Sequence, residues 1–270
     1  MSATIFIRTF LTGSILLSVC LLLADNTMDQ PAIATTYSLA VETQAMEPPQ
    51  GATIKGMVTF SGMISEEVET VPQSVEFCAE KPITPNLSVK QDTRGVKNVI
   101  VYIDKIHHLV EVGTEHHLVV TNKDCAFTPR VGTLTVGHHM DIANDDPIIH
   151  NAHVRNGKKT LLNVGLVPGI RSISKEVRNP GILTLQCAIH EFMEGFVGVF
   201  PHSYHSQTDD IGEFRIGSVP PGEYELVIWH ELLGTLRKVL IVKTDEQEVE
   251  INFEYPMPMT QDRQPIILSQ

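Results

Sequence analysis

Short runs of apolar and β-branched residues, interrupted by turn residues, recur along most of the chain. Residues 248–254 show the pattern most simply, because Val249, Ile251 and Phe253 alternate with polar residues and would share one face of a strand. No stretch carries the apolar stripe of a long amphipathic helix. The chain is therefore predicted to be all-β, with strands expected at residues 51–62, 96–103, 117–121, 131–136, 140–143, 148–154, 161–167, 172–177, 181–186, 195–200, 208–216, 220–229, 238–243 and 248–254.

The two ends of the chain lack this pattern. Arg8 precedes an apolar run, residues 10–24, that is shorter than the roughly 20 residues of a membrane-spanning helix. Residues 1–24 are therefore predicted to be a secretory signal peptide, and an uncleaved anchor is the alternative. Residues 25–50 show no sustained period and predict a flexible linker, and residues 256–270 predict a tail.

A signal peptide, cleaved near Ala24 or after Ala34, implies an oxidising location in the periplasm, the cell envelope or the medium. The processed protein would then not be an integral membrane protein. Lys and Arg together number 20 against 32 for Asp and Glu, which gives a net charge of −12. This charge repels phosphates, so nucleic acid is excluded as an expected partner, whereas a cationic protein partner is compatible with it.

The cysteine count leaves one thiol without a partner. Removal of Cys20 with the signal peptide leaves Cys78, Cys125 and Cys187, an odd number in an exported protein. The economical assignment is a disulfide between Cys78 and Cys125 and a free thiol at Cys187. A disulfide between Cys125 and Cys187 stays open on counting alone, and it would remove the thiol that the next motif requires.

Three side chains of unusual chemistry lie within seven residues, at Cys187, His190 and Met193. A thiolate, an imidazole and a thioether are ligands that suit a small copper site, with one further histidine from elsewhere. Cys187 follows a predicted strand in which alternate residues face the core, so its sulfur is expected to point inward. His150 is the best candidate for the further ligand, because it follows an Asn-Asp-Asp-Pro turn and opens a predicted strand.

The remaining histidines favour other roles. His153 lies three residues after His150 and is expected on the opposite face of the strand, which makes it a reserve ligand. The doublets at 107–108, 116–117 and 138–139 stand beside predicted turns and are expected to be solvated. His202 and His205 could bind metal weakly at the surface. Residues 229–231 lie at the end of a predicted strand, where they are expected to pack against the core and to end in solvent.

Residues 116–200 resemble the cupredoxins. Residues 144–151 read Asn-x-Asp-x3-His-Asn, and residues 187–195 read Cys-x2-His-x2-Met-x-Gly, with the short loop spacing of the amicyanins. The resemblance implies a Greek-key β-barrel or sandwich in which Asn151 would hold the cysteine loop to the histidine strand. Ile189 and Glu191 replace the prolines of the amicyanin loop, which predicts a less rigid loop. The resemblance implies one type 1 copper ion with four ligands, His150, Cys187, His190 and Met193.

The flanking segments resemble a second kind of module, the carboxypeptidase regulatory-like (prealbumin-like) β-sandwich. The resemblance rests on Gly-x-Ile-x-Gly-x-Val-x-Phe from Gly51 and on Asp-x2-Gly-x-Phe and Pro-x-Gly-x-Tyr after residue 208. Bacterial methylamine-utilisation-like proteins show a similar combination. We therefore expect a sandwich built from residues 51–110 and 202–255, with the cupredoxin domain at 111–201 inserted. Two domains in series are the simpler alternative.

These features favour an exported one-electron carrier that cycles between Cu(II) and Cu(I), without enzymatic activity. The cupredoxin resemblance implies that His190 is the port for electrons and that the partner is a redox protein, such as a cationic c-type cytochrome or a dehydrogenase. Two alternatives remain. One is a binding or adhesion module with a vestigial site, and the other is a copper-handling protein that uses the histidine doublets.

Overall fold

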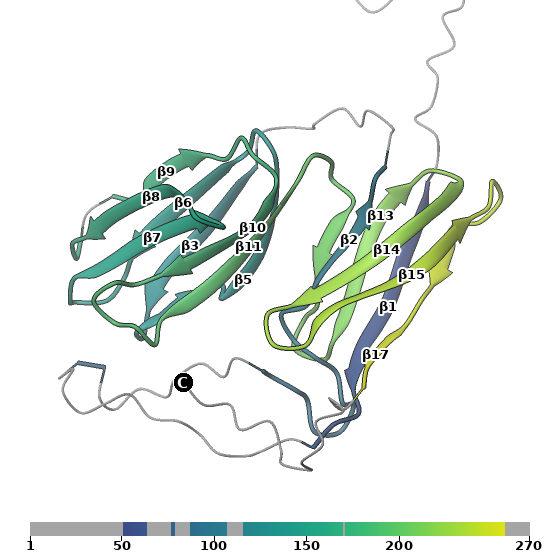
Figure 1. The fold of residues 1–270 in the computed structure, drawn as a ribbon, viewed down its shortest axis with the longest axis horizontal. Coiled ribbons are helices and arrows are strands. Elements are labelled where there is room, and N and C mark those ends of the chain that lie inside the picture. The colour runs from purple at the N-terminus through teal and green to yellow at the C-terminus, as the bar shows by residue number, and fades with distance from the viewer. Residues whose placement is uncertain (1–50, 64–76, 79–86, 107–115, 170, 257–270) are drawn as a thin grey trace, which may run out of the picture. The chain divides into compact units, whose positions relative to one another are not determined.

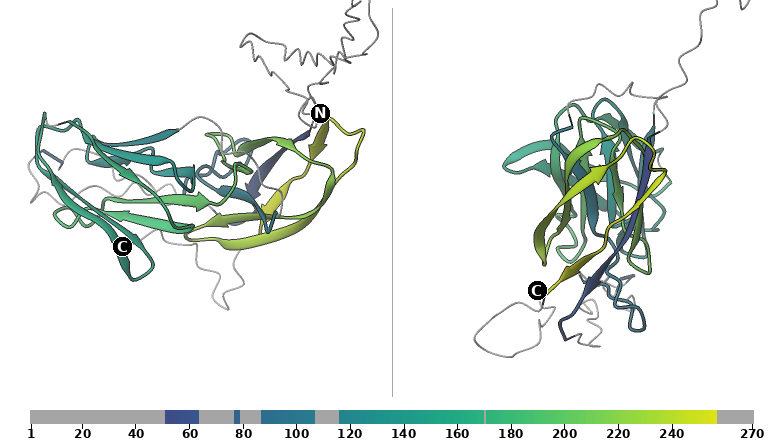
Figure 2. Two further views of the ribbon diagram at one scale, coloured as in Figure 1. Left: turned by 90° about the horizontal axis from the view of Figure 1, so that it is seen from above. Right: turned by 90° about the vertical axis from the view of Figure 1, so that its right-hand side faces the viewer.

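A computed structural model describes residues 51–63, 77–78, 87–106, 116–169 and 171–256. All elements in these ranges are strands, as Figures 1 and 2 show, which confirms the all-β prediction. No helix in the described part of the chain has the length and apolarity needed to cross a membrane. The predicted signal peptide, linker and tail, and the boundary expected at residue 110, lie outside the described residues.

One sandwich, which we name the inner sandwich, is built from strands of residues 117–200. Its first sheet has the order β5-β11-β10-β7-β8, and its second has the order β4-β3-β6-β9. Two pairs, β3 with β6 and β5 with β11, run parallel, and the other pairs are antiparallel. The strands are β3 (His117–Lys123), β4 (Ala126–Thr128), β5 (Val131–Thr135), β6 (His139–Asn144), β7 (His150–Asn156), β8 (Lys159–Leu166), β9 (Ile173–Glu176), β10 (Gly181–Gln186) and β11 (Glu194–Phe200).

The other sandwich, the outer sandwich, takes strands from both sides of the inner one in sequence. Its sheets have the orders β13-β1-β16 and β12-β2-β14-β15, and β17 also pairs with β1. The two strands that precede the inner sandwich therefore pair with strands that follow it. The strands are β1 (Ala52–Phe60), β2 (Ile100–Asp104), β12 (His205–Gln207), β13 (Glu213–Val219), β14 (Gly222–His230), β15 (Gly234–Val242), β16 (Glu248–Glu250) and β17 (Phe253–Tyr255).

Alternation of apolar and polar residues decides which side chains fill the inner core. In β7 the buried positions are His150, Ala152 and Val154, and in β10 they are Leu183 and Leu185. β7 and β10 are antiparallel neighbours, so their buried faces form one surface of the same core. The buried face of β7 thus carries a histidine where an apolar residue would ordinarily stand.

The expectation of one strand over residues 248–254 is wrong. The strand is broken between β16 and β17, although both pieces run parallel to β1. At the break, Ile251 donates its N–H to the Lys55 carbonyl, and the Asn252 side chain accepts the N–H of Met57. A Cβ on Gly56 would lie 1.9 Å from the Ile251 carbonyl oxygen, so only glycine permits this close approach.

His202, just before β12, is buried, and His205, the first residue of β12, is partly buried, which corrects the expectation that both are surface groups that bind metal weakly. His202 is 7% exposed, and its Nδ1 accepts the N–H of Tyr204. His205 lies with its Nε2 3.0 Å from Thr135 Oγ1 and stacks on Phe200. Burial, followed by the nearby charges of His202 and His138, lowers the pKa of His205 to about 4.

We expect this shift to make the metal-free protein sensitive to acid. An ordinary histidine in the unfolded chain titrates near 6.5, so between pH 6.5 and 4 the unfolded state binds a proton that folded His205 does not. Stability should therefore fall by about 3 kcal/mol as the pH drops through this window, and then level off. Denaturant titrations of wild type and His205→Gln across the window would measure the difference in slope.

A matched control for this experiment is His153→Gln, because His153 faces outward from β7. The control should keep the wild-type slope of unfolding free energy against pH. Equal slopes for wild type and His205→Gln would contradict the expectation.

Candidate metal centre

The pairing of β7 with β10 brings two of the predicted donors together. In the register of this pair Gln186 lies opposite His153, so Cys187 emerges just beyond the strand end beside the start of β7. The Asn151 N–H donates to the Cys187 sulfur at 3.3 Å. His150, the first residue of β7, is completely buried, and Cys187 is 1% exposed. Both side chains therefore lie in the core at one end of the sheet.

The loop between β10 and β11 adds the other two predicted ligands. Met193 donates its N–H to the His190 carbonyl at 2.9 Å, and Cys187 donates its N–H to the Met193 carbonyl at 3.2 Å. These bonds fold the loop back on itself, so that Met193 ends beside Cys187 before β11 begins. Met193 is 2% exposed and belongs to the same core cluster as Cys187. His190 is 6% exposed.

The distances between donor atoms suit a single ion. The Cys187 sulfur lies 4.0 Å from His150 Nδ1 and 3.7 Å from His190 Nδ1, and the two Nδ1 atoms lie 3.0 Å apart. Donors that are each about 2 Å from a shared ion stand roughly 3–4 Å from one another. One thiolate and two imidazoles are the donor types that a type 1 copper site uses, and here all three are buried and close together. The residues present therefore fit the metal that the sequence predicts.

The protonation states also favour a metal. Burial raises the pKa of Cys187, but the His150 side chain beside the sulfur and backbone N–H groups, including that of Asn151, outweigh it and lower the pKa overall. Burial, and then the charge of His150, lowers the pKa of His190. A thiolate and a neutral imidazole are the forms that bind a metal. The pocket therefore favours the ligand forms of both groups.

Asn151 links three parts of the site. Its Oδ1 accepts the Ala188 N–H at 3.3 Å, and its Nδ2 donates to Asn163 Oδ1 at 2.9 Å and to the Val164 carbonyl at 3.1 Å. The side chain thus connects the ligand loop to β8, while its backbone N–H binds the Cys187 sulfur. This is the arrangement that the cupredoxin resemblance implies for Asn151.

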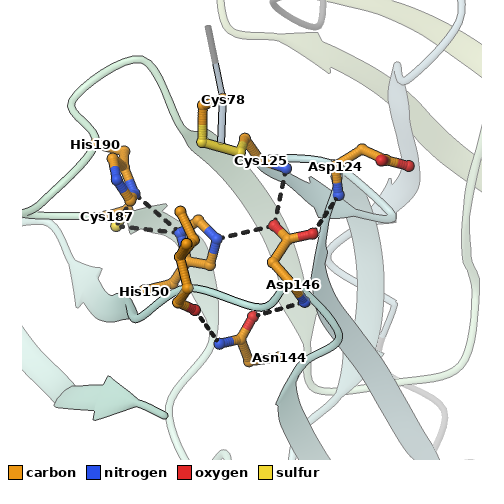
Figure 3. The surroundings of a disulfide bond; sticks show 9 residues. Cys78, Asp124, Cys125, Asn144, Asp146, His150, Cys187 and His190 are labelled. Atoms are coloured by element: carbon orange, nitrogen blue, oxygen red, sulfur yellow. Dashed lines mark hydrogen bonds and ion pairs between the residues drawn. A yellow bond between two sulfur atoms is a disulfide. The ribbon is translucent and has the colours of Figure 1, made fainter. Parts of the chain in front are cut away.

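Asp146 is a functional residue that the sequence reading missed. Its Oδ2 lies 2.8 Å from His150 Nε2, and its two oxygens also accept the N–H groups of Asp124 and Cys125 (Figure 3). Asn144 Oδ1 in turn accepts the Asp146 N–H. The sequence interpretation treated this Asn-Asp-Asp-Pro segment as a turn and as part of the cupredoxin-like motif, but it assigned Asp146 no role. Its signal was the spacing of four residues between a carboxylate and a predicted metal ligand.

The cysteines take one of the two pairings left open by counting. Cys78 and Cys125 form a disulfide, and Cys187 is a free, buried thiol. Cys125 also lies close to Asp146 and His150, so these three residues form a second group of close potential donors. Because its sulfur is bonded to Cys78, Cys125 does not offer a thiolate there.

The other predicted histidines lie away from the donors. His153 faces outward, with its Nε2 3.0 Å from Thr160 Oγ1. The rings of His116 and His138 pack edge to face, and those of His117 and His139 stack. His138 is 7% exposed, which corrects the expectation that this doublet is solvated. Within the described ranges, no doublet joins a group of three close donors, and His107 and His108 lie outside them.

Exposed apolar side chains border the site. Ile149 is 51% and Ile189 is 55% exposed, and they directly precede His150 and His190 in sequence. The Phe192 ring lies 5.8 Å from the His190 ring, centroid to centroid. The two histidine donors are thus each preceded by an apolar residue at the surface.

No protein family profile matches the chain, and no curated protein does either. Among solved structures, it is similar to a copper-containing nitrite reductase from Thermus scotoductus SA-01, with 24% identity, a TM-score of 0.29 and coverage of 34% of this chain. It is also similar to a mutant of amicyanin in the reduced state, with 21% identity, a TM-score of 0.29 and coverage of 37% of this chain and 97% of that one. A second amicyanin mutant, in its Cu(I) form, shows 20% identity, a TM-score of 0.27 and the same coverage. The chain spans only 25% of the nitrite reductase.

Proposed function

We propose that this protein is an exported type 1 copper protein that carries single electrons and has no enzymatic activity of its own. The observation that carries the proposal is the convergence of three buried donors, a free thiol and two imidazoles, on one point of the inner core. His150, Cys187, His190 and Met193 would hold the ion. Bound copper supplies a Cu(II)/Cu(I) couple.

The chain's own contribution is a fixed donor geometry. Asn151 binds both the sulfur and the backbone of the ligand loop, and two backbone hydrogen bonds close the loop between Cys187 and Met193. These bonds support a loop that lacks the prolines of the amicyanins. Donors held in place need little rearrangement when an electron arrives or leaves, and this favours fast transfer over catalysis.

His190 is the proposed electron port. It is the most exposed of the three donors, although only 6% of it reaches solvent, and the apolar side chain of Ile189 next to it is open to a partner. The net charge of −12 supports a cationic redox partner, such as a c-type cytochrome or a dehydrogenase. The predicted signal peptide supports a periplasmic or cell-envelope location.

Anaerobic copper titration tests the proposal. We expect one copper per chain, an intense visible absorption band and the paramagnetic resonance spectrum of a type 1 site. His153→Ala is the control, because His153 faces away from the donors, and it should leave all three readouts unchanged. Absence of the band would support a binding module with an unused site. A stoichiometry well above one would support copper handling through the histidine doublets.

A further inference from the structure

A buried chain of contacts connects the disulfide to one of the proposed copper ligands. Cys125, bonded to Cys78, donates its N–H to Asp146 Oδ2 at 2.9 Å, and the same oxygen lies 2.8 Å from His150 Nε2 (Figure 3). The Asp124 N–H donates to the other oxygen at 2.7 Å. Cys78 and His150 are fully buried, and Cys125 and Asp146 are 5% and 4% exposed.

The carboxylate decides which nitrogen of His150 carries hydrogen. An ionised carboxylate only accepts hydrogen bonds, so the His150 nitrogen that faces Asp146 must be a donor. Nε2 therefore carries hydrogen, and a neutral ring presents the Nδ1 lone pair to Cys187 and His190, the direction that metal binding requires. Asp146 thus selects the tautomer of His150 that can bind a metal.

The backbone that donates to Asp146 has a conformation that side chains disfavour. Asp124 and Cys125 form the two-residue turn between β3 and β4, with φ angles of 52° and 59°. Such turns prefer Asn-Gly, because a residue with a side chain disfavours the left-handed region. The disulfide to buried Cys78 holds Cys125 in place, so cleavage of the bond would allow this turn to relax and its N–H groups to move away from Asp146.

We propose that Asp146 and the Cys78–Cys125 disulfide together position His150, so that the oxidation state of the disulfide sets the metal affinity of the site. The inference rests on the proposed copper function. A dithiol that reduces the disulfide gives it two electrons and two protons, which leaves two thiols and the oxidised dithiol. The coupling is reciprocal, so bound copper should make the disulfide harder to reduce by the same factor.

Asp146→Asn tests the positioning. The amide keeps the volume but has one acceptor oxygen, so its NH₂ group faces either the Asp124 N–H or, in the second orientation, both the Cys125 N–H and His150 Nε2. In the second orientation the amide NH₂ group donates to His150 Nε2, so Nε2 must be the acceptor and the hydrogen of the neutral ring lies on Nδ1. We expect Cu(I) affinity, measured by competition with a chromophoric chelator, to fall about 10- to 100-fold. Nitrogen NMR of the metal-free protein should show His150 protonated on Nε2 in wild type, and on Nδ1 in the variant when the amide turns its NH₂ group to the ring.

Asp141→Asn is a matched control, because Asp141 binds His117 Nδ1 at 2.7 Å in a partly exposed carboxylate–histidine pair that does not contact the donors. It should leave both the Cu(I) affinity and the His150 tautomer unchanged. A wild-type His150 that carries its hydrogen on Nδ1, or a Cu(I) affinity that Asp146→Asn leaves unchanged, would overturn the positioning role. The NMR result holds even if the wild type binds no copper, so failure of the proposed function is recognised separately.

A double-mutant cycle tests the role of the disulfide. The variant Cys78→Ala/Cys125→Ala should lose about 10-fold or more in Cu(I) affinity. If the disulfide acts through Asp146, adding Asp146→Asn to this variant should cost clearly less than it costs in wild type. Additive losses, or wild-type affinity without the disulfide, would overturn the coupling. If the disulfide-free variant does not fold, the reciprocal measurement is a reductive titration of the Cys78–Cys125 disulfide in the wild type, with and without copper. Equal midpoints of disulfide reduction in the two titrations would overturn the coupling.

Discussion

Cys187→Ser should abolish the intense visible band of the copper-loaded protein. The band arises from transfer of charge from a thiolate to the metal, and a serine hydroxyl in the same buried position stays protonated. Metal-binding free energies of about 10–16 kcal/mol shared over four ligands give roughly 3 kcal/mol for one ligand, which corresponds to about a hundredfold loss of affinity. Absorption spectroscopy and chelator competition would measure the two effects.

Ala188→Ser is the control for this experiment, because it introduces the same hydroxyl one residue later on an exposed position of the loop. It should retain the visible band and most of the copper affinity. Retention of the band in Cys187→Ser would show that the copper lies elsewhere, and would contradict the proposed ligand set.

The second large effect is expected from Glu231→Leu, which should lower the free energy of unfolding by about 3–5 kcal/mol. Glu231 Oε1 lies 2.5 Å from Arg130 Nη1, and the side chains are only 8% and 5% exposed. Removal of the carboxylate leaves the buried guanidinium without this counter-charge. His230, 3.5 Å from Glu231, is not a replacement cation for the pair, because burial, followed by the charge of Arg130, lowers its pKa to about 3.

Arg130→Met/Glu231→Leu is the informative comparison, since it removes both charges and leaves apolar groups of similar size. It should recover most of the stability lost in the single variant. Chemical denaturation of the three proteins provides the measurement. A double variant as unstable as Glu231→Leu alone would show that packing, including the Arg130 contact with the Phe196 ring, outweighs the charge effect.

Local patterns in the sequence were sufficient to predict the all-β fold and the residues of the candidate centre. Alternation within β7 and β10 depends only on the two-residue period of a strand, so the inward direction of His150 and of Cys187 could be inferred without their partners. The spacing of Cys187, His190 and Met193 is likewise contained in one short loop.

The features that sequence reading missed depend on distant partners. Glu231 was expected at a solvated strand end, but it is buried against Arg130, about a hundred residues earlier in the chain. The break between β16 and β17 depends on Gly56 in β1. Asp146 contacts the turn at Asp124 and Cys125, which belongs to another strand pair. No pattern within any one of these segments reveals the residue that it meets.

The position of β1 in its sheet has a consequence for biosynthesis. Among the described strands, β1 pairs only with those that follow the inner sandwich, apart from an isolated bridge between Thr59 and Gly95. Lys55 contacts Glu248 across 193 residues of sequence. A nascent chain therefore holds all strands of the inner sandwich once Phe200 has been added, whereas β1 waits for residues up to Tyr255. Contacts that close long loops form late, and an unpaired strand is open to aggregation. The proposed copper donors thus lie in the part of the protein that can be completed first, and loss of the C-terminal strands would leave β1 exposed.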